Sequence, residues 1–227
     1  MHVPTRADGE LDYTCAVDPL GVRDYALSIA RPLAGSFGLW RLPQALALFE
    51  HVSAMTYVAD PLGVNDFVQS PLETLRHRAG NCAALTVLLT STLRSVGIPS
   101  RMMGIDDGTR DGGHLLAQLC IGGYDLDDLP DDLDDCRAPR WLREIYDVDD
   151  VLNNMYFERD RGNRWLFLDP VFSEFAGDVE GLVEGGFMWF SRNGDGIEWE
   201  DAVYFSDGSD RMHSIQAIST SYVQIVS

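Results

Sequence analysis

Hydrophobic and polar positions along the chain follow two different periods, and the change between them divides the sequence. Up to about residue 96, apolar residues recur at helical spacing, which predicts helices over 42–58, 71–78 and 82–96. Beyond that point the apolar runs are short, rich in β-branched and aromatic residues, and bounded by turn residues, which predicts strands. Helices followed by strands favour an α+β fold with a mostly antiparallel sheet.

The predicted helix 82–96 is apolar around nearly its whole circumference, which is typical of a helix buried inside a domain. Gly97 suits the position just after its last turn, and Pro99 prevents the helix from continuing. We therefore expect this segment to be the central helix that packs on the sheet.

The predicted strands begin with 100–106 and 114–126. Residues 155–172 form two strand-like runs around Arg-Gly-Asn, which indicates a hairpin. A second pair of strands, separated by a glycine-rich turn, is predicted within 186–209, and the tail from Met212 onward is β-prone.

The length of 227 residues suits one domain, with a mixed, Pro- and Gly-containing beginning and an acidic stretch in the middle. The acidic stretch reads as a surface insertion with a short helix near 139–146. The predicted organisation is an N-terminal arm at 1–41, a core at 42–175 with the acidic insertion at 125–154, and a β-rich extension at 176–227.

The charge is strongly unbalanced, with a formal net charge of −19. Such a field repels nucleic acid, so no nucleic-acid partner is expected. All 17 basic residues are arginine, and 26 of the 36 acidic residues are aspartate. This composition resembles that of proteins from salt-loving organisms, in which dissolved salt screens the repulsion. A GC-rich genome is the alternative explanation of arginine without lysine, but it does not predict the acidic excess.

The sequence has no apolar stretch of about 18 residues and no apolar signal segment at its beginning. We therefore expect no membrane contact and a cytoplasmic or virion-associated location. The four cysteines form no CxxC pair, so neither a zinc site nor a disulfide framework is expected. The acidic run 125–135 is predicted to be solvated surface, with calcium binding as the alternative because clustered carboxylates suit that ion.

Cys82 stands at the start of the buried helix, directly after Gly80 and Asn81. A helix N-terminus favours a thiolate through its dipole and its free N–H groups, and the same groups can stabilise an oxyanion. Gly80 permits either an unusual backbone angle or a close approach at this point. A buried, unreactive cysteine is the simpler alternative, but it requires no such setting.

A nucleophilic cysteine needs a base and a group that orients the base. Of the five histidines, His114 opens a predicted strand 32 residues after Cys82, which leaves room for the helix, a strand and the return. Asp169 ends another strand-like run, directly before Pro170, and can reach the same edge of the sheet. Cys82, His114 and Asp169 are therefore the candidate catalytic residues.

Three blocks in this order, "GNCAALTVLLTSTLRSVGIPSRMMG", "GGHLLAQLCIGG" and "WLFLDP", resemble the transglutaminase-like superfamily. In that family a Gly-x-Cys opens the central helix, Gly-Ile-Pro follows it, a His starts one strand and an Asp-Pro ends the next. The resemblance covers roughly 42–172. It implies a papain-like core, with Cys82 as nucleophile, His114 as base and Asp169 as orienting acid. Asn81 and Leu116 depart from the aspartate and the aromatic residue that many members have at these positions.

The resemblance implies attack on an amide carbonyl and an acyl-enzyme, with no cofactor and no metal. With water as acceptor the chain is a peptidase or amidase acting on a peptide or protein, and with an amine it is an acyl transferase. Hydrolysis is the expected reaction. The alternative is a catalytically silent component of an assembly such as a virus particle, or a homo-oligomer, held by the N-terminal arm and the C-terminal β region.

Overall fold

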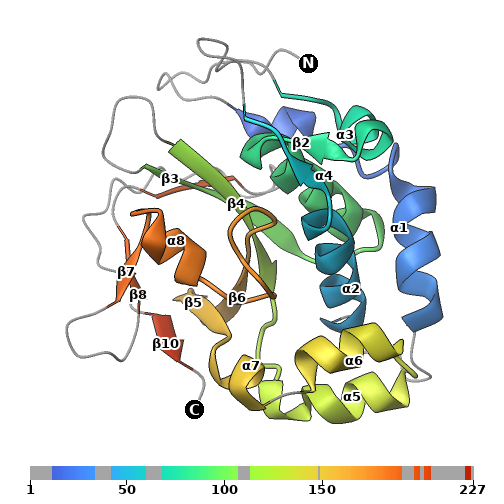
Figure 1. Ribbon diagram of the computed structural model, residues 1–227, viewed down its shortest axis with the longest axis vertical. Helices are drawn as coiled ribbons and strands as arrows, with labels where there is room; N and C mark the ends of the chain where they lie inside the picture. Colours follow the sequence, from blue (N-terminus) through green and yellow to red (C-terminus); the bar gives the residue numbers. More distant parts are fainter. Residues whose placement is uncertain are drawn as a thin grey trace.

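The computed structural model describes residues 12–33, 42–59, 68–106, 113–147, 149–190, 197–199, 202–205 and 223–225. Within them a six-stranded sheet has the order β10-β5-β6-β4-β3-β9, and every neighbouring pair is antiparallel. Helices α1 to α4 lie together beside this sheet (Figure 1). The predicted α+β fold with a mostly antiparallel sheet is confirmed.

The central helix is α4, Cys82–Ser95, and its side chains from Ala83 to Leu93 are buried. Gly97 follows it with a φ of 75°, a conformation that glycine adopts without strain. Helix α3, Pro71–His77, begins with a capping box in which Ser70 and Glu73 satisfy each other's backbone N–H groups. Both helices therefore lie within one residue of their predicted bounds.

Helix α2, Leu42–Ser53, ends five residues earlier than its pattern predicted. Residues Thr56–Tyr57 form strand β1 instead, which pairs in parallel with β2, Ala79–Gly80. Threonine, tyrosine and valine favour extended backbone, and the partner strand lies more than twenty residues away in sequence. This pairing places β1 beside the segment that leads into Cys82.

The described part of the N-terminal segment is helical and packed, which differs from the expected arm. It contains α1, Arg23–Ala30, whose Ala26 and Ala30 are buried. The Arg23 side chain donates to the backbone oxygen of Ser95 at 2.8 Å, at the end of α4. Residues 12–33 are therefore tied to the central helix. The remainder of the predicted arm lies outside the described residues, and the domain boundaries stay a prediction.

The central strands are β3, Ser100–Asp106; β4, Gly113–Cys120; β5, Tyr156–Asp160; and β6, Asn163–Leu168. The edge strands are β9, Val203–Phe205, and β10, Val223–Ile225. The β5–β6 hairpin and the short pair β7, Trp189–Phe190, with β8, Ile197–Glu198, confirm the two predicted strand pairs. The rest of the tail lies outside the described residues.

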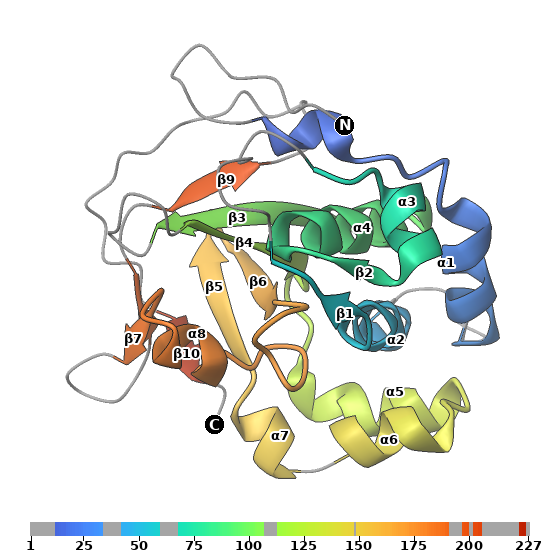
Figure 2. The ribbon, with the colours of Figure 1, turned by 45° about the horizontal axis from the view of Figure 1, so that its top comes forward.

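Each face of the sheet carries its own apolar cluster. The face toward α4 contributes Ala117, Leu119, Leu166 and Leu168 to the larger cluster. The opposite face packs Met103, Leu116 and Phe167 against Leu182 of α8, Glu180–Glu184, and against Met188. The sheet is therefore covered on both sides (Figure 2).

The acidic insertion folds into short helices below α2: η3, Leu126–Asp128; α5, Leu129–Asp135; α6, Arg140–Tyr146; and α7, Asp149–Asn153 (Figure 1). Leu126, Leu129 and Leu133 recur at helical spacing and are fully buried in the main core. The expectation of purely solvated surface is therefore wrong for these leucines. The many aspartates obscured a helical pattern, because aspartate has a low helix propensity.

A buried charged group joins the strands on the face that bears α8. The Arg101 guanidinium donates to Gln118 at 2.6 Å, Glu158 at 2.7 Å and Asp160 at 2.6 Å. It lies between the rings of Trp165 and Tyr204, with centroids at 4.1 and 4.3 Å. Arg101 on β3 therefore contacts side chains of four other strands, β4, β5, β6 and β9. Each nitrogen of its guanidinium has a hydrogen-bond partner, as a buried charge requires.

Candidate active site

Cys82 is the first residue of α4, and the residues before it fix its position. Asn81 has extended backbone, and its side-chain oxygen accepts from the N–H of Ala84 at 2.8 Å. This N-cap satisfies one of the free donors of the first turn and starts the helix at the cysteine. The thiol itself is half-buried.

Gly80 lies against side chains of both α3 and α4. A Cβ atom added there would stand 2.8 Å from the Cβ of Ala84 and 3.3 Å from Cγ2 of Thr74. Gly80 does not have a positive φ. Close approach, the second of the two roles considered for this glycine, is therefore the one that the structure requires.

His114 and Asp169 meet at one end of the sheet. Ala117 on β4 pairs with Leu168 on β6, so the strand that starts near His114 runs beside the one that ends before Asp169. His114 Nε2 and Asp169 Oδ2 are 2.7 Å apart, and the two residues are 5% and 0% exposed. The other carboxylate oxygen, Oδ1, accepts from the N–H groups of Val171 and Phe172. The carboxylate is thus fixed by backbone on one side and holds the imidazole on the other.

Two phenylalanine rings cover the imidazole. The ring centroid of Phe172 lies 4.9 Å from that of His114 and the centroid of Phe187 lies at 5.1 Å. Phe172 remains 39% exposed. The rings keep water from the His114–Asp169 pair, which strengthens the attraction between the two groups. Neither phenylalanine was predicted as part of the site, because a single aromatic residue beyond Asp-Pro has no distinctive pattern.

The ionisation of His114 follows from these contacts. Burial lowers the pKa of His114, but the charge of Asp169, the hydrogen bond with Asp169 and a hydrogen bond with Cys82 together raise it to about 10. Since Nε2 faces Asp169, the other ring nitrogen is the one that remains for the thiol. At neutral pH the imidazole is therefore protonated and presents a positive charge beside the Cys82 side chain.

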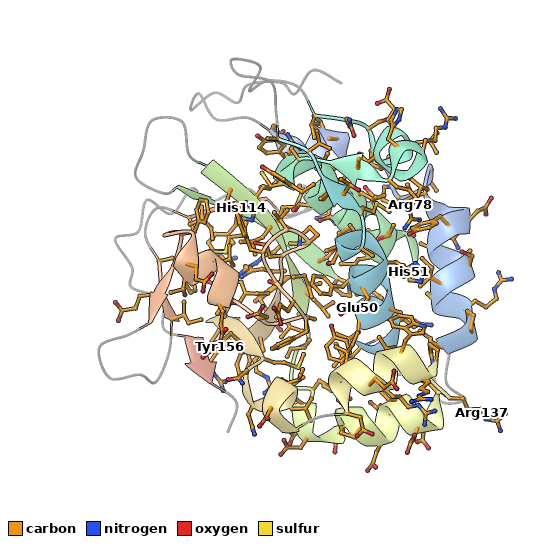
Figure 3. The ribbon with its side chains drawn as sticks, in the orientation of Figure 1. Glu50, His51, Arg78, His114, Arg137 and Tyr156 are labelled. Carbon is orange, nitrogen blue, oxygen red and sulfur yellow. The ribbon has the colours of Figure 1, made fainter. Side chains whose placement is uncertain are left out.

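The structure thus brings together all three residues that the sequence singled out. Burial raises the pKa of the Cys15 thiol, with Asp12 adding to the effect, and burial also raises the pKa of Cys136. His51 lies on α2, between the rings of Tyr25 and Trp141, and well away from His114 (Figure 3). His51 therefore belongs to another part of the molecule.

The described residues contain no group of three or more His, Cys, Asp or Glu side chains that is placed to hold a metal ion. None of the helices in the described ranges is long and apolar enough to cross a membrane.

Comparisons with known proteins found one matching family and several structures that are similar to this chain. The family model of the transglutaminase-like superfamily matches residues 41–170, whereas no curated protein matches the chain. A candidate cysteine protease from Cytophaga hutchinsonii is similar in structure, with 13% identity over 93% of this chain and a TM-score of 0.41. This chain spans 58% of the length of that protein.

LapG from Legionella pneumophila resembles this chain in structure to a comparable degree. Its EGTA-treated form has 13% identity, covers 90% of this chain and gives a TM-score of 0.43. Its calcium-bound form has 14% identity, covers 89% of this chain and gives a TM-score of 0.39. In both cases 94% of LapG is covered. At TM-scores this low, the likeness to these structures assigns neither substrate nor activity.

Proposed function

The chain belongs to the transglutaminase-like superfamily, and from this premise we propose that it is a thiol hydrolase that cleaves an amide bond in a peptide or protein. Cys82 is the nucleophile, His114 transfers the proton and Asp169 orients the imidazole. The observation that carries the proposal is the buried His114–Asp169 pair, 2.7 Å apart, whose imidazole also contacts Cys82.

The first half of the reaction forms an acyl-enzyme. The Cys82 sulfur attacks the carbonyl carbon, a C–S bond forms, and the carbonyl oxygen takes up the negative charge. A helix leaves the N–H groups of its first turn without partners inside the helix, and such groups at the start of α4 can stabilise that oxygen; the N–H of Ala84 donates to the side chain of Asn81. His114 then gives its proton to the amide nitrogen, and the C–N bond breaks.

The second half restores the enzyme. His114, now neutral, accepts a proton from water as the water oxygen attacks the thioester. The C–S bond breaks, the acid leaves, and the thiolate and the imidazolium re-form. Asp169 stabilises the positive charge on His114 in both halves and keeps the ring in place. If an amine takes the place of water, the same steps transfer the acyl group, so transfer is a variant of this proposal.

Selective alkylation tests the proposal before any substrate is known. The folded protein is treated briefly with iodoacetamide at pH 6 and at pH 8, and each cysteine is quantified by peptide mass spectrometry. We expect Cys82 to react well ahead of Cys120 and Cys136 and to keep most of its rate at pH 6. An ordinary thiol, with a pKa near 8.5, loses about a hundredfold of its thiolate between these two pH values.

His114→Ala is the decisive variant, because it removes the cation beside the thiol. Its Cys82 should react at pH 6 no faster than an ordinary thiol. If Cys82 is inert in the unmodified protein, or if His114→Ala makes no difference, the hydrolase proposal fails. The structural component of an assembly, considered above as the alternative, then becomes the better explanation of the fold.

A further inference from the structure

Phe172 presents an apolar surface to solvent directly beside the imidazole. The large apolar side chains that are exposed in the described ranges are Leu20, Tyr57, Val58, Leu72, Trp141 and Phe172. Of these, Phe172 packs its ring against His114 with a centroid distance of 4.9 Å and keeps 39% of its surface open. Exposing a large aromatic ring to water costs free energy, and its position next to a reactive group indicates use in binding.

The backbone around Phe172 is held from several directions. Its N–H donates to Oδ1 of Asp169, and a Cβ atom on Gly181 would stand 2.4 Å from its carbonyl oxygen. Helix α8 therefore packs directly against the Phe172 backbone. The neighbouring residues are fixed by Asp178, which accepts from the N–H of Glu174 at 2.7 Å. Because the Phe172 backbone is already held in place, binding a substrate group to its ring does not carry the entropic cost of ordering a loop.

The chemistry of the site decides which part of a substrate meets this ring. His114 must give its proton to the departing nitrogen, so the leaving group has to lie on the His114 side of the scissile bond. Phe172 covers that same imidazole. A side chain attached to the leaving amine thus comes within reach of the ring, whereas the acyl part lies toward Cys82 and the start of α4.

We propose that Phe172 is a specificity-determining residue that selects an apolar group, preferably a ring, on the leaving-amine side of the substrate. This inference rests on the proposed function, because it requires that Cys82 and His114 act on the same amide. An apolar group buried against an aromatic ring changes discrimination by about 10- to 100-fold.

Two alkylating amides that carry the same reactive group test this inference. Iodoacetamide and N-benzyl iodoacetamide both form a C–S bond with Cys82 and release iodide, and the second carries a ring on its amide nitrogen. The measurement is the ratio of their second-order rate constants at Cys82, because the ratio cancels the reactivity of the thiol. In the unmodified protein we expect the benzyl compound to react about tenfold faster or more.

Phe172→Ala should bring this ratio close to one, and Phe172→Leu, which keeps an apolar side chain, should leave an intermediate value. Trp141→Ala is the matched control, since Trp141 is 40% exposed but lies on α6, and its ratio should not change. Circular dichroism establishes that each variant is folded. If Phe172→Ala does not fold, the Phe172→Leu ratio alone decides.

The outcomes separate this inference from the proposed function. If Cys82 reacts readily but shows no preference for the benzyl compound, or if Phe172→Ala keeps the preference, the role of Phe172 is overturned and the hydrolase proposal stands. If Cys82 reacts with neither compound, the hydrolase proposal itself fails.

Discussion

The two carboxylate oxygens of Asp169 have different roles, and one substitution can separate these roles. Oδ1 accepts from the backbone after β6, and Oδ2 meets His114. Asparagine keeps the shape and the first acceptor but removes the charge. The charge of Asp169 is the largest of the effects that raise the pKa of His114 against burial. Without it, the pKa of His114 falls from about 10 toward its ordinary value of 6.5, because burial is then opposed only by the weaker contacts.

Asp169→Asn should therefore reduce the pH dependence of stability that His114 contributes. In the unmodified protein the folded-state pKa of about 10 exceeds the unfolded value of 6.5, so this contribution is fully present below pH 6.5 and is lost as the pH rises through 10. In Asp169→Asn the folded-state pKa of His114 lies closer to 6.5, so this contribution is smaller and is lost at a lower pH. The measurement is the unfolding midpoint in urea between pH 5 and pH 10. Parallel curves for the two proteins would contradict the assigned ion pair.

Among the helices and strands, those whose ends are marked by local residues were predicted accurately, and those that depend on distant parts of the sequence were not. Helices α3 and α4 were predicted almost to the residue, because Ser70, Asn81, Gly97 and the prolines mark their ends locally. The end of α2 was missed, because β1 depends on a partner strand that the local pattern does not reveal. Likewise Cys82, His114 and Asp169 were singled out as candidates from their places in the chain, whereas Phe187 and Arg101 make contacts between distant strands and loops that the local pattern does not reveal.

Gly80 provides a test of how tightly α3 and α4 are packed. Gly80→Ala would place a methyl group 2.8 Å from the Cβ of Ala84, and overpacking of this kind costs about 1–3 kcal/mol of unfolding free energy. The matched control is Gly123→Ala, where an added Cβ meets nothing within 4 Å and φ is not positive. Urea unfolding should show a loss for the first variant and almost none for the second. Equal stability of both variants would mean that the helices can separate without cost.

For the whole molecule, a net charge of −19 must weaken the folded state through self-repulsion in dilute buffer. The described ion pairs differ in how far salt can affect them. Arg140–Glu144 and Arg143–Asp134 are largely exposed and contribute little, whereas the Arg101 group is buried and is screened much less. Added salt should therefore relieve the repulsion while the interactions of the sheet interior persist.

We accordingly expect the melting temperature to rise as sodium chloride increases from about 0.05 to about 2 M, with most of the rise below about 0.5 M, where screening changes fastest. Calorimetry across the salt series measures this. Potassium chloride is the control for an effect specific to one ion. A melting temperature that is flat or falls with salt would contradict the salt adaptation that the composition suggests, and it would leave the fold and the site unaffected.

The pairing of β9 and β10 at the two outer edges of the sheet has a consequence for how the chain is made. Strands β3 to β6 are all complete by residue 168, but their outer partners come from 203–205 and 223–225. During synthesis from the N-terminus, four strands thus leave the ribosome with both edges unpaired, and open edges invite pairing with other nascent chains. A stall before residue 203 leaves a sheet that can polymerise in both directions. Strands β9 and β10 therefore protect the two edges of the sheet against such pairing.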